Sequence, residues 1–235
     1  MATREPLALV QGGARPVADS AGAEERLADR AYKELERLIV TAELAPGAWA
    51  TETDLSERLG LSRTPIREAL QRLVRARLIE VVPRRGLRIT AVRVEDQLAL
   101  LAFRREVERF LATRSAERAT PADRRRFREL AADMDACART RDEAGHYRFD
   151  LEYKLLLVRT AGNDHAGEAI VPLWASSRRF AWVTRAVRDI ALSSTLSAAV
   201  MRAIADGDGP RAAQCTDAYM DALEQLARSS LDVLP

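Results

Sequence analysis

The chain is poor in several residue types that mark particular classes of protein. Its 235 residues include two cysteines, two histidines and only 5% aromatic residues. Cys137 and Cys215 lie far apart, which excludes a disulfide framework and indicates a reducing compartment. With 11 glycines and 9 prolines, the composition also excludes collagen-like and low-complexity chains. Because 47% of the residues are hydrophobic, the chain can bury packed cores, and disorder throughout is excluded.

Long hydrophobic runs are also missing. The longest, Leu98 to Phe103 and Ile170 to Ala175, are far shorter than the roughly 18 residues of a membrane-spanning helix. The apolar patch Leu7 to Val10 is too short for the core of a signal peptide. We therefore expect residues 1–23 to form a flexible lead-in, and the protein to be soluble and cytoplasmic, without a membrane partner.

Positive charge is almost entirely arginine and is concentrated in one segment. Lys33 and Lys154 are the only lysines among 37 basic residues, which nearly balance 35 acidic residues. Residues 61–93, however, carry nine arginines against Glu68 and Glu80, so the rest of the chain is net negative. A focused positive field in an otherwise acidic molecule indicates a site for a polyanion. An ordinary solvated helix face is the alternative.

Hydrophobic periodicity in residues 24–93 changes from helical to strand-like. Apolar residues three and four positions apart predict three helices, of which the last two are joined by a tight turn at Gly60-Leu61. Two short β-prone runs around Pro83 to Gly86 then predict a hairpin. This order of elements is that of a winged helix-turn-helix. The predicted helices cover about 24–44, 52–58 and 62–76, and the hairpin strands 78–82 and 87–92.

Residues 94–235 show helical periodicity and no strand-like alternation. Breakers such as Thr120-Pro121 separate the segments, and Pro172 is expected to kink or divide one of them. The predicted fold class is therefore mainly α, with a winged helix-turn-helix domain at 24–93 and an all-helical bundle at 94–235. The predicted helices of the bundle cover 95–118, 121–142, 144–161, 166–186, 194–206 and 210–229.

The helix predicted over 62–76 has one apolar and one polar face. The apolar face should pack on the two preceding helices. The polar face suits phosphates and base edges, because arginine pairs with guanine and glutamine with adenine. Ser62 at the N-cap, with the unbonded N–H groups of the first turn, suits a phosphate oxygen. A polar face of a purely structural helix is the alternative. The inward set is Ile66, Ala69, Leu70, Leu73 and Val74, the outward set is Thr64, Arg67, Gln71 and Arg75, and Arg63 lies with Thr64 at the helix N-terminus, which leads into the groove.

The hairpin tip is also basic. Arg84 and Arg85 precede Gly86 there. Such a tip can enter an adjacent minor groove, where a narrow A·T-rich stretch attracts arginine. A plain turn with solubilising charges is the alternative.

Two sets of motifs resemble a known family. The run Ser62 to Leu70, with Pro46-Gly47 before it and Arg85-Gly86 after it, is similar to the N-terminal domain of the GntR family of bacterial transcription regulators. Further motifs resemble the all-helical FCD ligand-binding domain of the FadR-like branch of that family. These are Arg104 with Glu108, Asp150 with Tyr153, Ala161-Gly162-Asn163, and Ala203 to Asp208.

The resemblance implies a homodimeric transcription regulator controlled by a small-molecule effector. Its partner would be double-stranded operator DNA, so the protein would associate with the bacterial nucleoid, and we expect it to act as a repressor. The residues that the resemblance places on DNA are Arg63, Thr64 and Arg67, with Arg85 and Gly86 at the wing.

The resemblance also bears on metal binding. Similar FCD domains hold a metal with one aspartate and three histidines, but here those positions are Asp150, Lys154, Ser197 and Tyr219. An ammonium group at Lys154 repels a divalent cation and should pair with Asp150 one helical turn away. We therefore expect no metal and no cofactor, with a rearranged site of His146, Asp150 and Cys215 as the alternative. Outside such a site, His146 should be a partly exposed helix residue, His165 a loop residue and Cys215 a small core residue.

Without a metal, other side chains must hold the effector. Arg104 and Lys154 suit an anionic or carboxylate-bearing molecule. Trp174 and Trp182 either line an apolar cavity or pack in the core or a dimer interface. The expected effector-binding set is Arg104, Asp150, Lys154, Asn163, Arg178, Ser197 and Tyr219.

Other functions have less support in the sequence. There is no Ser/His/Asp or Cys/His arrangement, Gly-rich phosphate loop or dense ligand cluster, so we expect no enzymatic activity. Three alternatives stay open. They are an effector-independent regulator whose helical domain serves only dimerisation, an enzyme with a winged-helix appendage, and an adaptor whose winged helix binds protein.

Overall fold

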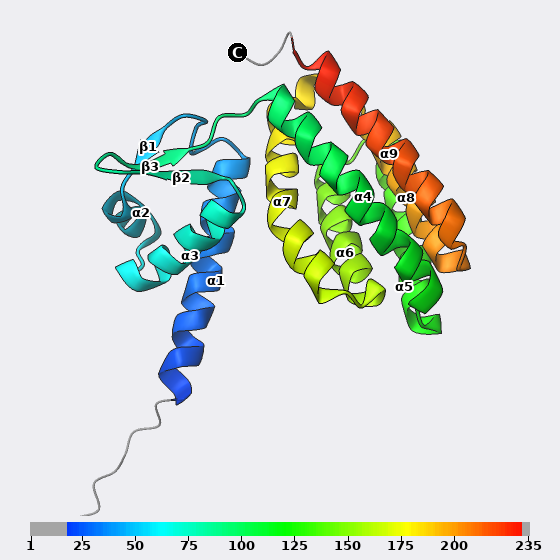
Figure 1. Ribbon diagram of the computed structural model, residues 1–235, viewed down its shortest axis with the longest axis horizontal. Helices are drawn as coiled ribbons and strands as arrows, with labels where there is room; N and C mark the ends of the chain where they lie inside the picture. Colours follow the sequence, from blue (N-terminus) through cyan, green and yellow to red (C-terminus); the bar gives the residue numbers. More distant parts are fainter. Residues whose placement is uncertain (1–17, 232–235) are drawn as a thin grey trace, which may run out of the picture.

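A computed structural model describes residues 18–231 of the chain. It shows a small α/β part and a larger helical part joined by the segment between β3 and α4 (Figure 1). This architecture agrees with the predicted fold class. The elements of the first part are α1 (Ala18–Val40), β1 (Trp49–Ala50), α2 (Glu52–Leu59), α3 (Arg63–Arg75), β2 (Ile79–Val82) and β3 (Gly86–Ile89).

The turn between α2 and α3 is defined by caps. Thr51 and Asp54 form a reciprocal capping box that starts α2. Gly60 ends the helix at a φ of 62°, in the left-handed region that glycine enters without steric cost. The chain can therefore turn tightly into α3, as the sequence predicts.

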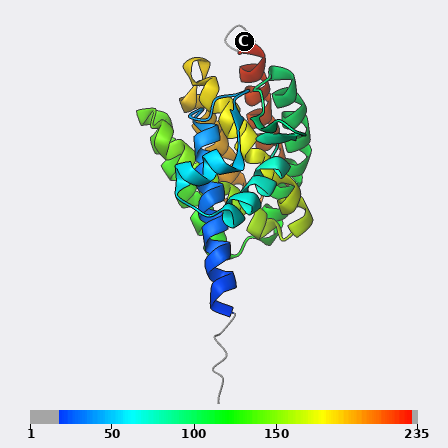
Figure 2. The ribbon, with the colours of Figure 1, turned by 90° about the vertical axis from the view of Figure 1, so that its left-hand side faces the viewer.

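The first helix differs from its predicted bounds. It begins at Ala18 and ends at Val40, whereas the sequence predicts 24–44, so six residues assigned to a flexible lead-in are helical. Alanine, the strongest helix former, occupies three of those six positions and outweighs Gly22. The rest of the expected lead-in, residues 1–17, lies outside the described residues. In the two views, α1 extends well past α2 and α3 (Figures 1 and 2).

The hairpin is part of a three-stranded antiparallel sheet with the order β1-β3-β2. The short strand β1 was not predicted. It pairs Trp49 with Arg88 and Ala50 with Leu87. Two residues are too few to show the alternation by which a strand is identified in a sequence.

The second part is an all-helical bundle that follows the predicted segments closely. Pro172 does not divide α7, because Ile170 and Trp174 on either side are buried and hold the helix across a single missing hydrogen bond. Among the helices of residues 18–231, none combines the length and apolar composition needed to cross a bilayer. The elements are α4 (Val94–Arg118), α5 (Pro121–Thr140), α6 (Glu143–Ala161), α7 (Asp164–Val183), the 3-10 turn η1 (Arg185–Val187), α8 (Ile190–Asp206) and α9 (Gly209–Ser229).

Each part has its own apolar core. In the N-terminal part, Leu35, Ile66 and Leu73 are fully buried between α1, α3 and the sheet. In the bundle, Phe127 and Leu157 are equally buried. One residue of the bundle, Ala175 of α7, belongs to the N-terminal core, so α7 is the helix that joins the two parts.

Candidate functional site

The polar face of α3 is open to solvent. Arg67 has a side chain that is 61% exposed, whereas Ile66 and Leu73 on the opposite face are completely buried. Val74 was placed with the inward set, but it is 38% exposed. On a helical wheel it lies only about 20° from Arg67, at the edge of the polar face. The exposed residues of the predicted set are Ser62, Arg63, Thr64, Arg67, Gln71 and Arg75.

The N-terminus of α3 keeps its backbone donors available. Ser62 occupies the N-cap, yet within the described residues its side chain makes no capping hydrogen bond, and no acidic residue lies in the first turn. Both α2 and α5, in contrast, begin with a capping box, at Thr51 and Thr120. The start of α3 therefore combines unbonded N–H groups with Arg63, an arrangement that favours a phosphate oxygen.

Two acidic residues hold arginines of α3 in place. The Arg67 Nε atom donates to Glu52 Oε2 at 2.7 Å, and Arg72 Nη1 donates to Asp29. The Arg72 guanidinium also lies 4.1 Å from the centre of the Tyr32 ring. Sequence reasoning missed both partners, because they lie 15 and 43 residues away along the chain. Glu52 orients Arg67 before any ligand arrives and engages only its Nε atom, so the terminal nitrogens stay available to another acceptor.

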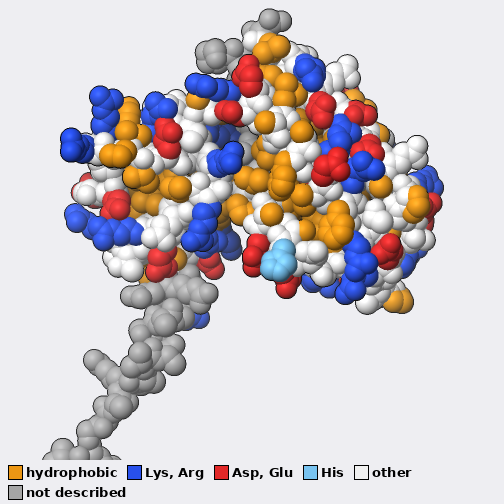
Figure 3. Space-filling view, in the orientation of Figure 1, with side chains coloured by type: hydrophobic (Ala, Val, Ile, Leu, Met, Phe, Trp, Pro, Cys, Tyr) orange, Lys and Arg blue, Asp and Glu red, His pale blue; other side chains and the backbone are white. Residues whose placement is uncertain are grey.

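The tip of the hairpin, between β2 and β3, projects from the molecule with exposed side chains at Arg84 and Arg85. Gly86 has a φ of 101°, and a Cβ atom there would approach the backbone oxygen of Ala50 to 3.1 Å. Glycine is therefore required for β3 to lie beside β1. Basic side chains surround this part of the molecule in the space-filling view (Figure 3).

A second candidate site is a buried cluster of charges inside the bundle. Arg104 of α4 is 2% exposed and donates from Nε to Glu108 at 2.6 Å. Lys154 and Asp150 of α6 form an ion pair of 2.8 Å and are also buried, at 4% and 5% exposed. Although burial alone would raise it, the pKa of Asp150 is held below its usual range by the Lys154 ammonium. The predicted Lys154–Asp150 pair is therefore present.

Unsatisfied polar atoms gather in this cluster. Within residues 18–231, Arg104 Nη2, Asp150 Oδ1 and Arg188 Nε are buried without a hydrogen-bond partner. Their residues line a cavity of about 40 Å³, together with Tyr219. Buried polar groups are normally paired, so these atoms mark a place where a ligand or water would be stabilised.

His146 differs from its predicted setting. It is 1% exposed rather than partly exposed, because α8 and the η1 segment cover it. Its Nε2 atom lies 2.8 Å from Arg188 Nη2, and its Nδ1 atom 2.7 Å from Ser194 Oγ. Since arginine can only donate, Nε2 accepts and Nδ1 carries the proton. Burial, with the charges of Arg188 and Lys154 nearby, lowers the pKa of His146 to about 4.

Several predicted effector residues lie elsewhere or have other partners. Asn163 is not among the residues that line the cavity; it is the N-cap of α7 and accepts from the backbone of Ala166 at 2.9 Å. Ser197 is fully buried on α8, where its hydroxyl has no partner in the described part of the chain. Arg178 borders the cavity, but its guanidinium pairs with Glu36 of α1. Sequence reasoning missed Arg188, which belongs to the cavity.

The remaining sequence expectations concern metals and tryptophans. Residues 18–231 contain no group of three or more His, Cys, Asp or Glu side chains that could hold a metal ion. Cys215 packs partly buried against the core of the bundle, and His165 lies exposed in the first turn of α7 rather than in a loop. Trp174 is buried and donates to Glu108 at 2.9 Å, so it belongs to the core.

Helix α7 contacts both candidate sites. Ser177 accepts from Arg104 Nη1 at 2.9 Å in the buried cluster. About 100° around the helix, Ser176 donates to the carbonyl of Ala76, directly after α3, at 3.0 Å. Arg178 binds Glu36 of α1, and Arg179 binds Thr90, the residue that follows β3. A displacement of α7 therefore changes contacts in both parts of the molecule.

Comparison with known protein families agrees with the division of the chain into an N-terminal part and a helical bundle. The FCD domain model matches residues 99–222, more than half of the chain, and the model described as bacterial regulatory proteins, gntR family, matches residues 27–89. An HTH-type transcriptional regulator of an unstable DNA locus in Streptomyces ambofaciens is 41% identical over 68 residues, which are 28% of this chain and 29% of that protein.

One Escherichia coli regulator is similar in both sequence and structure. The HTH-type transcriptional regulator McbR is 28% identical over 131 residues, which are 56% of this chain and 59% of McbR. The matches thus span less than two thirds of the length of these curated relatives. The solved structure of McbR covers 87% of this chain and 98% of its own, with a TM-score of 0.73 and 21% identity.

A second solved structure shows the same fold. A GntR regulator from a Rhodococcus species covers 86% of this chain and 98% of its own, with a TM-score of 0.64 and 24% identity. These relatives are transcription regulators and not enzymes. The chain therefore belongs to the GntR family of bacterial transcription regulators and carries an FCD domain after its winged helix-turn-helix.

Proposed function

We propose that the protein binds operator DNA through α3 and the hairpin tip. The observation that carries this proposal is the exposed polar face of α3, where Thr64, Arg67 and Gln71 all lie open to solvent. The uncapped N-terminus of α3 would take a phosphate, and Arg84 and Arg85 would enter the neighbouring minor groove. In this proposal residues 24–93 read DNA, and residues 94–235 bind the effector and form the dimer.

We propose that the protein acts as a homodimer. A single recognition helix contacts only a few base pairs, so helix-turn-helix proteins gain specificity by placing two reading heads on half-sites one helical turn apart. We further propose that the protein is a repressor. A relative named as the HTH-type transcriptional repressor RspR, from Escherichia coli, is 33% identical over 89 residues, which are 38% of this chain and 39% of RspR.

Replacing Arg67 with alanine tests the reading face. We expect the variant to lose about 1–3 kcal/mol of specific binding free energy, because base-edge hydrogen bonds are removed. DNA selected from random sequence supplies the operator, and fluorescence anisotropy measures affinity on duplexes with two half-sites and with one. Arg125→Ala is the matched control, since this arginine is exposed on α5, away from α3. Equal affinity of the two variants, or binding that is insensitive to salt, would contradict the proposal.

We propose that the buried charged cluster binds the effector, a small carboxylate that also carries a hydroxyl or ammonium group. The two unpaired donors, Arg104 Nη2 and Arg188 Nε, can each bind an anionic oxygen, whereas the unpaired acceptor Asp150 Oδ1 needs a hydrogen-bond donor. At about 40 Å³ the cavity is smaller than a typical ligand pocket. An effector must therefore widen it, and we propose that the widening displaces α7, because Ser177 lines the cavity and bonds to Arg104.

A thermal-melting screen with small hydroxy acids and amino acids tests the effector site. A compound present at about 100 times its Kd should stabilise the native protein by about 2.7 kcal/mol. The gain should disappear in Arg188→Gln and persist in Arg185→Gln, which alters an exposed arginine outside the cavity. If no compound in the panel raises the Tm, the alternative applies, in which the helical domain serves only dimerisation.

A further inference from the structure

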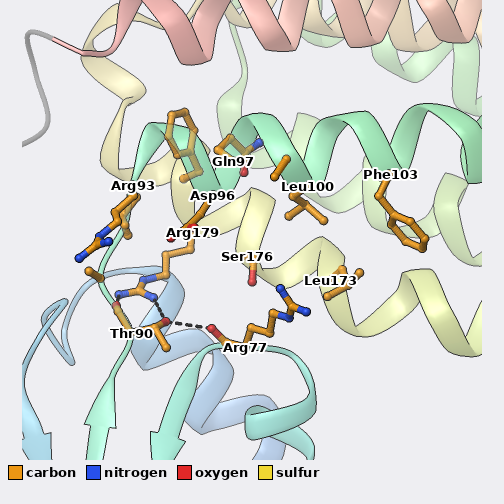
Figure 4. A pocket seen from close by; sticks show the side chains of 14 residues that line it. Arg77, Thr90, Arg93, Asp96, Gln97, Leu100, Phe103, Leu173, Ser176 and Arg179 are labelled. Atoms are coloured by element: carbon orange, nitrogen blue, oxygen red, sulfur yellow. Dashed lines mark hydrogen bonds between the residues drawn. The ribbon is translucent and has the colours of Figure 1, made fainter.

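A larger cavity lies between the two parts of the molecule, outside the buried cluster. Its volume is about 510 Å³, and it is bordered by α4, α7 and the segment that follows β3 (Figure 4). It shares only Gln97 and Phe180 with the small cavity inside the bundle. Its size and its position between domains are typical of sites for small molecules.

The cavity has an apolar side and a basic side. Leu100, Phe103 and Leu173 lie on the side of the bundle, and Phe103 is 41% exposed. Arg77 lies on the opposite side, in the N-terminal part (Figure 4). Among the described residues that line the cavity, the charged ones are Asp96, Arg77, Arg93 and Arg179.

Arg179 is a buried cation that forms no ion pair with the described residues. It is 3% exposed, and among residues 18–231 it donates to the hydroxyl of Thr90, at 2.9 Å, and to the Thr90 carbonyl. No carboxylate in residues 18–231 forms an ion pair with it, and its Nε atom has no partner there. Burial therefore lowers the pKa of Arg179 to about 10. An anion in the adjacent cavity would supply the missing opposite charge.

Arg77 is fixed in a conformation that few residues adopt. Its φ of 56° lies in the left-handed region, and its carbonyl accepts from the Thr90 hydroxyl at 2.9 Å. Thr90 thus bonds to both Arg77 and Arg179. Neither Arg77 nor Arg93 forms an ion pair within the described part of the chain, so both guanidinium groups are available to a ligand.

We propose that this interdomain cavity binds a small amphipathic anion, with its acidic group between the arginines and its apolar body against Leu100, Phe103 and Leu173. The site is separate from the proposed effector site and does not depend on the proposed function. Because its arginines come from both parts of the molecule, the ligand would fix the angle between them.

Fluorescence titration of the full chain with anilinonaphthalene sulfonate, in the absence of DNA, tests the site. This probe carries one anionic group on an apolar aromatic body. We expect saturable binding of one probe per chain, and a Kd raised by about tenfold or more in the double variant Arg77→Gln/Arg93→Gln. Both arginines are exposed, so the double variant should fold. Circular dichroism checks this.

Two controls separate this cavity from other binding modes. Arg125→Gln removes an exposed arginine elsewhere, and Arg188→Gln alters only the small cavity inside the bundle. Both should bind the probe with the affinity of the unaltered protein. The proposal is overturned if the unaltered protein binds no probe, as when a second copy covers the cavity, if the double variant keeps full affinity, or if Arg188→Gln loses it.

Discussion

Replacing Asp150 with alanine should destabilise the protein by about 3–5 kcal/mol, because it leaves the Lys154 ammonium buried without its partner. The two groups are 2.8 Å apart, and both side chains are less than a tenth exposed. Urea denaturation followed by circular dichroism measures the free energy of unfolding directly. The loss should appear as a lower denaturation midpoint with little change in the m-value.

The pair can be tested further by removing both charges. In Asp150→Leu/Lys154→Met the desolvation cost of both ions disappears, so the double variant should be markedly more stable than Asp150→Ala. Asp135→Ala is the matched control, because Asp135 pairs with Arg202 at 2.7 Å at the surface, with 34% and 45% of the side chains exposed. That change should cost about 1 kcal/mol or less. If Asp135→Ala and Asp150→Ala lowered the free energy of unfolding equally, breaking the buried pair would cost no more than breaking the exposed pair, which would contradict the prediction.

The stability of the protein should also fall at acidic pH through His146. Its pKa is about 4 in the folded state, against 6.5 for an ordinary histidine. Between these two pH values the unfolded chain therefore carries a proton on this residue, whereas the native protein does not. Below pH 6.5 protonation therefore favours unfolding, and from pH 7 to pH 4 this group alone should remove about 3 kcal/mol of stability. The groups that oppose its charging are Arg188 and Lys154, while Asp150 acts in the opposite direction.

The His146→Gln variant isolates this contribution. Glutamine can accept from Arg188 and donate to Ser194, as the neutral imidazole does, but it does not titrate. We expect the difference in unfolding free energy between the unaltered protein and the variant to shrink as the pH falls from 7 to 4. His165→Gln, which changes the exposed second histidine, should retain the full pH dependence. The same pH dependence in all three proteins would exclude His146 as its source.

The exposed polar face of α3 was largely predictable from sequence because its features are local. Helical spacing alone separates Ile66 and Leu73, which are buried, from Arg67, which is exposed. The exposure of every residue in the outward set agrees with the prediction, while its contact with DNA stays a prediction. Val74 was misplaced because it lies at the boundary between the two faces, where periodicity does not decide.

The interior of the bundle was less predictable because its contacts are distant in sequence. Lys154 and Asp150 are one turn apart, and their pairing followed from helical geometry. In contrast, Arg188 meets His146 across 42 residues, and Arg178 meets Glu36 across 142. Nothing in the local pattern of either segment indicates these partners, since they depend on how helices pack and not on how each helix forms.

The two-sided contacts of α7 bear on how such proteins can be recombined. Ser176 and Arg178 bond to Ala76 and Glu36 of the N-terminal part, whereas Ser177, between them, bonds to Arg104 of the bundle. A one-residue deletion upstream in this helix would rotate the following side chains by about 100°, so that Ser177 would take the place of Ser176 and Arg178 the place of Ser177. A chimaera that joins a foreign N-terminal domain to this helical domain must therefore bring compatible groups at the positions of Glu36, Ala76 and Thr90, even if the junction itself is placed in the linker.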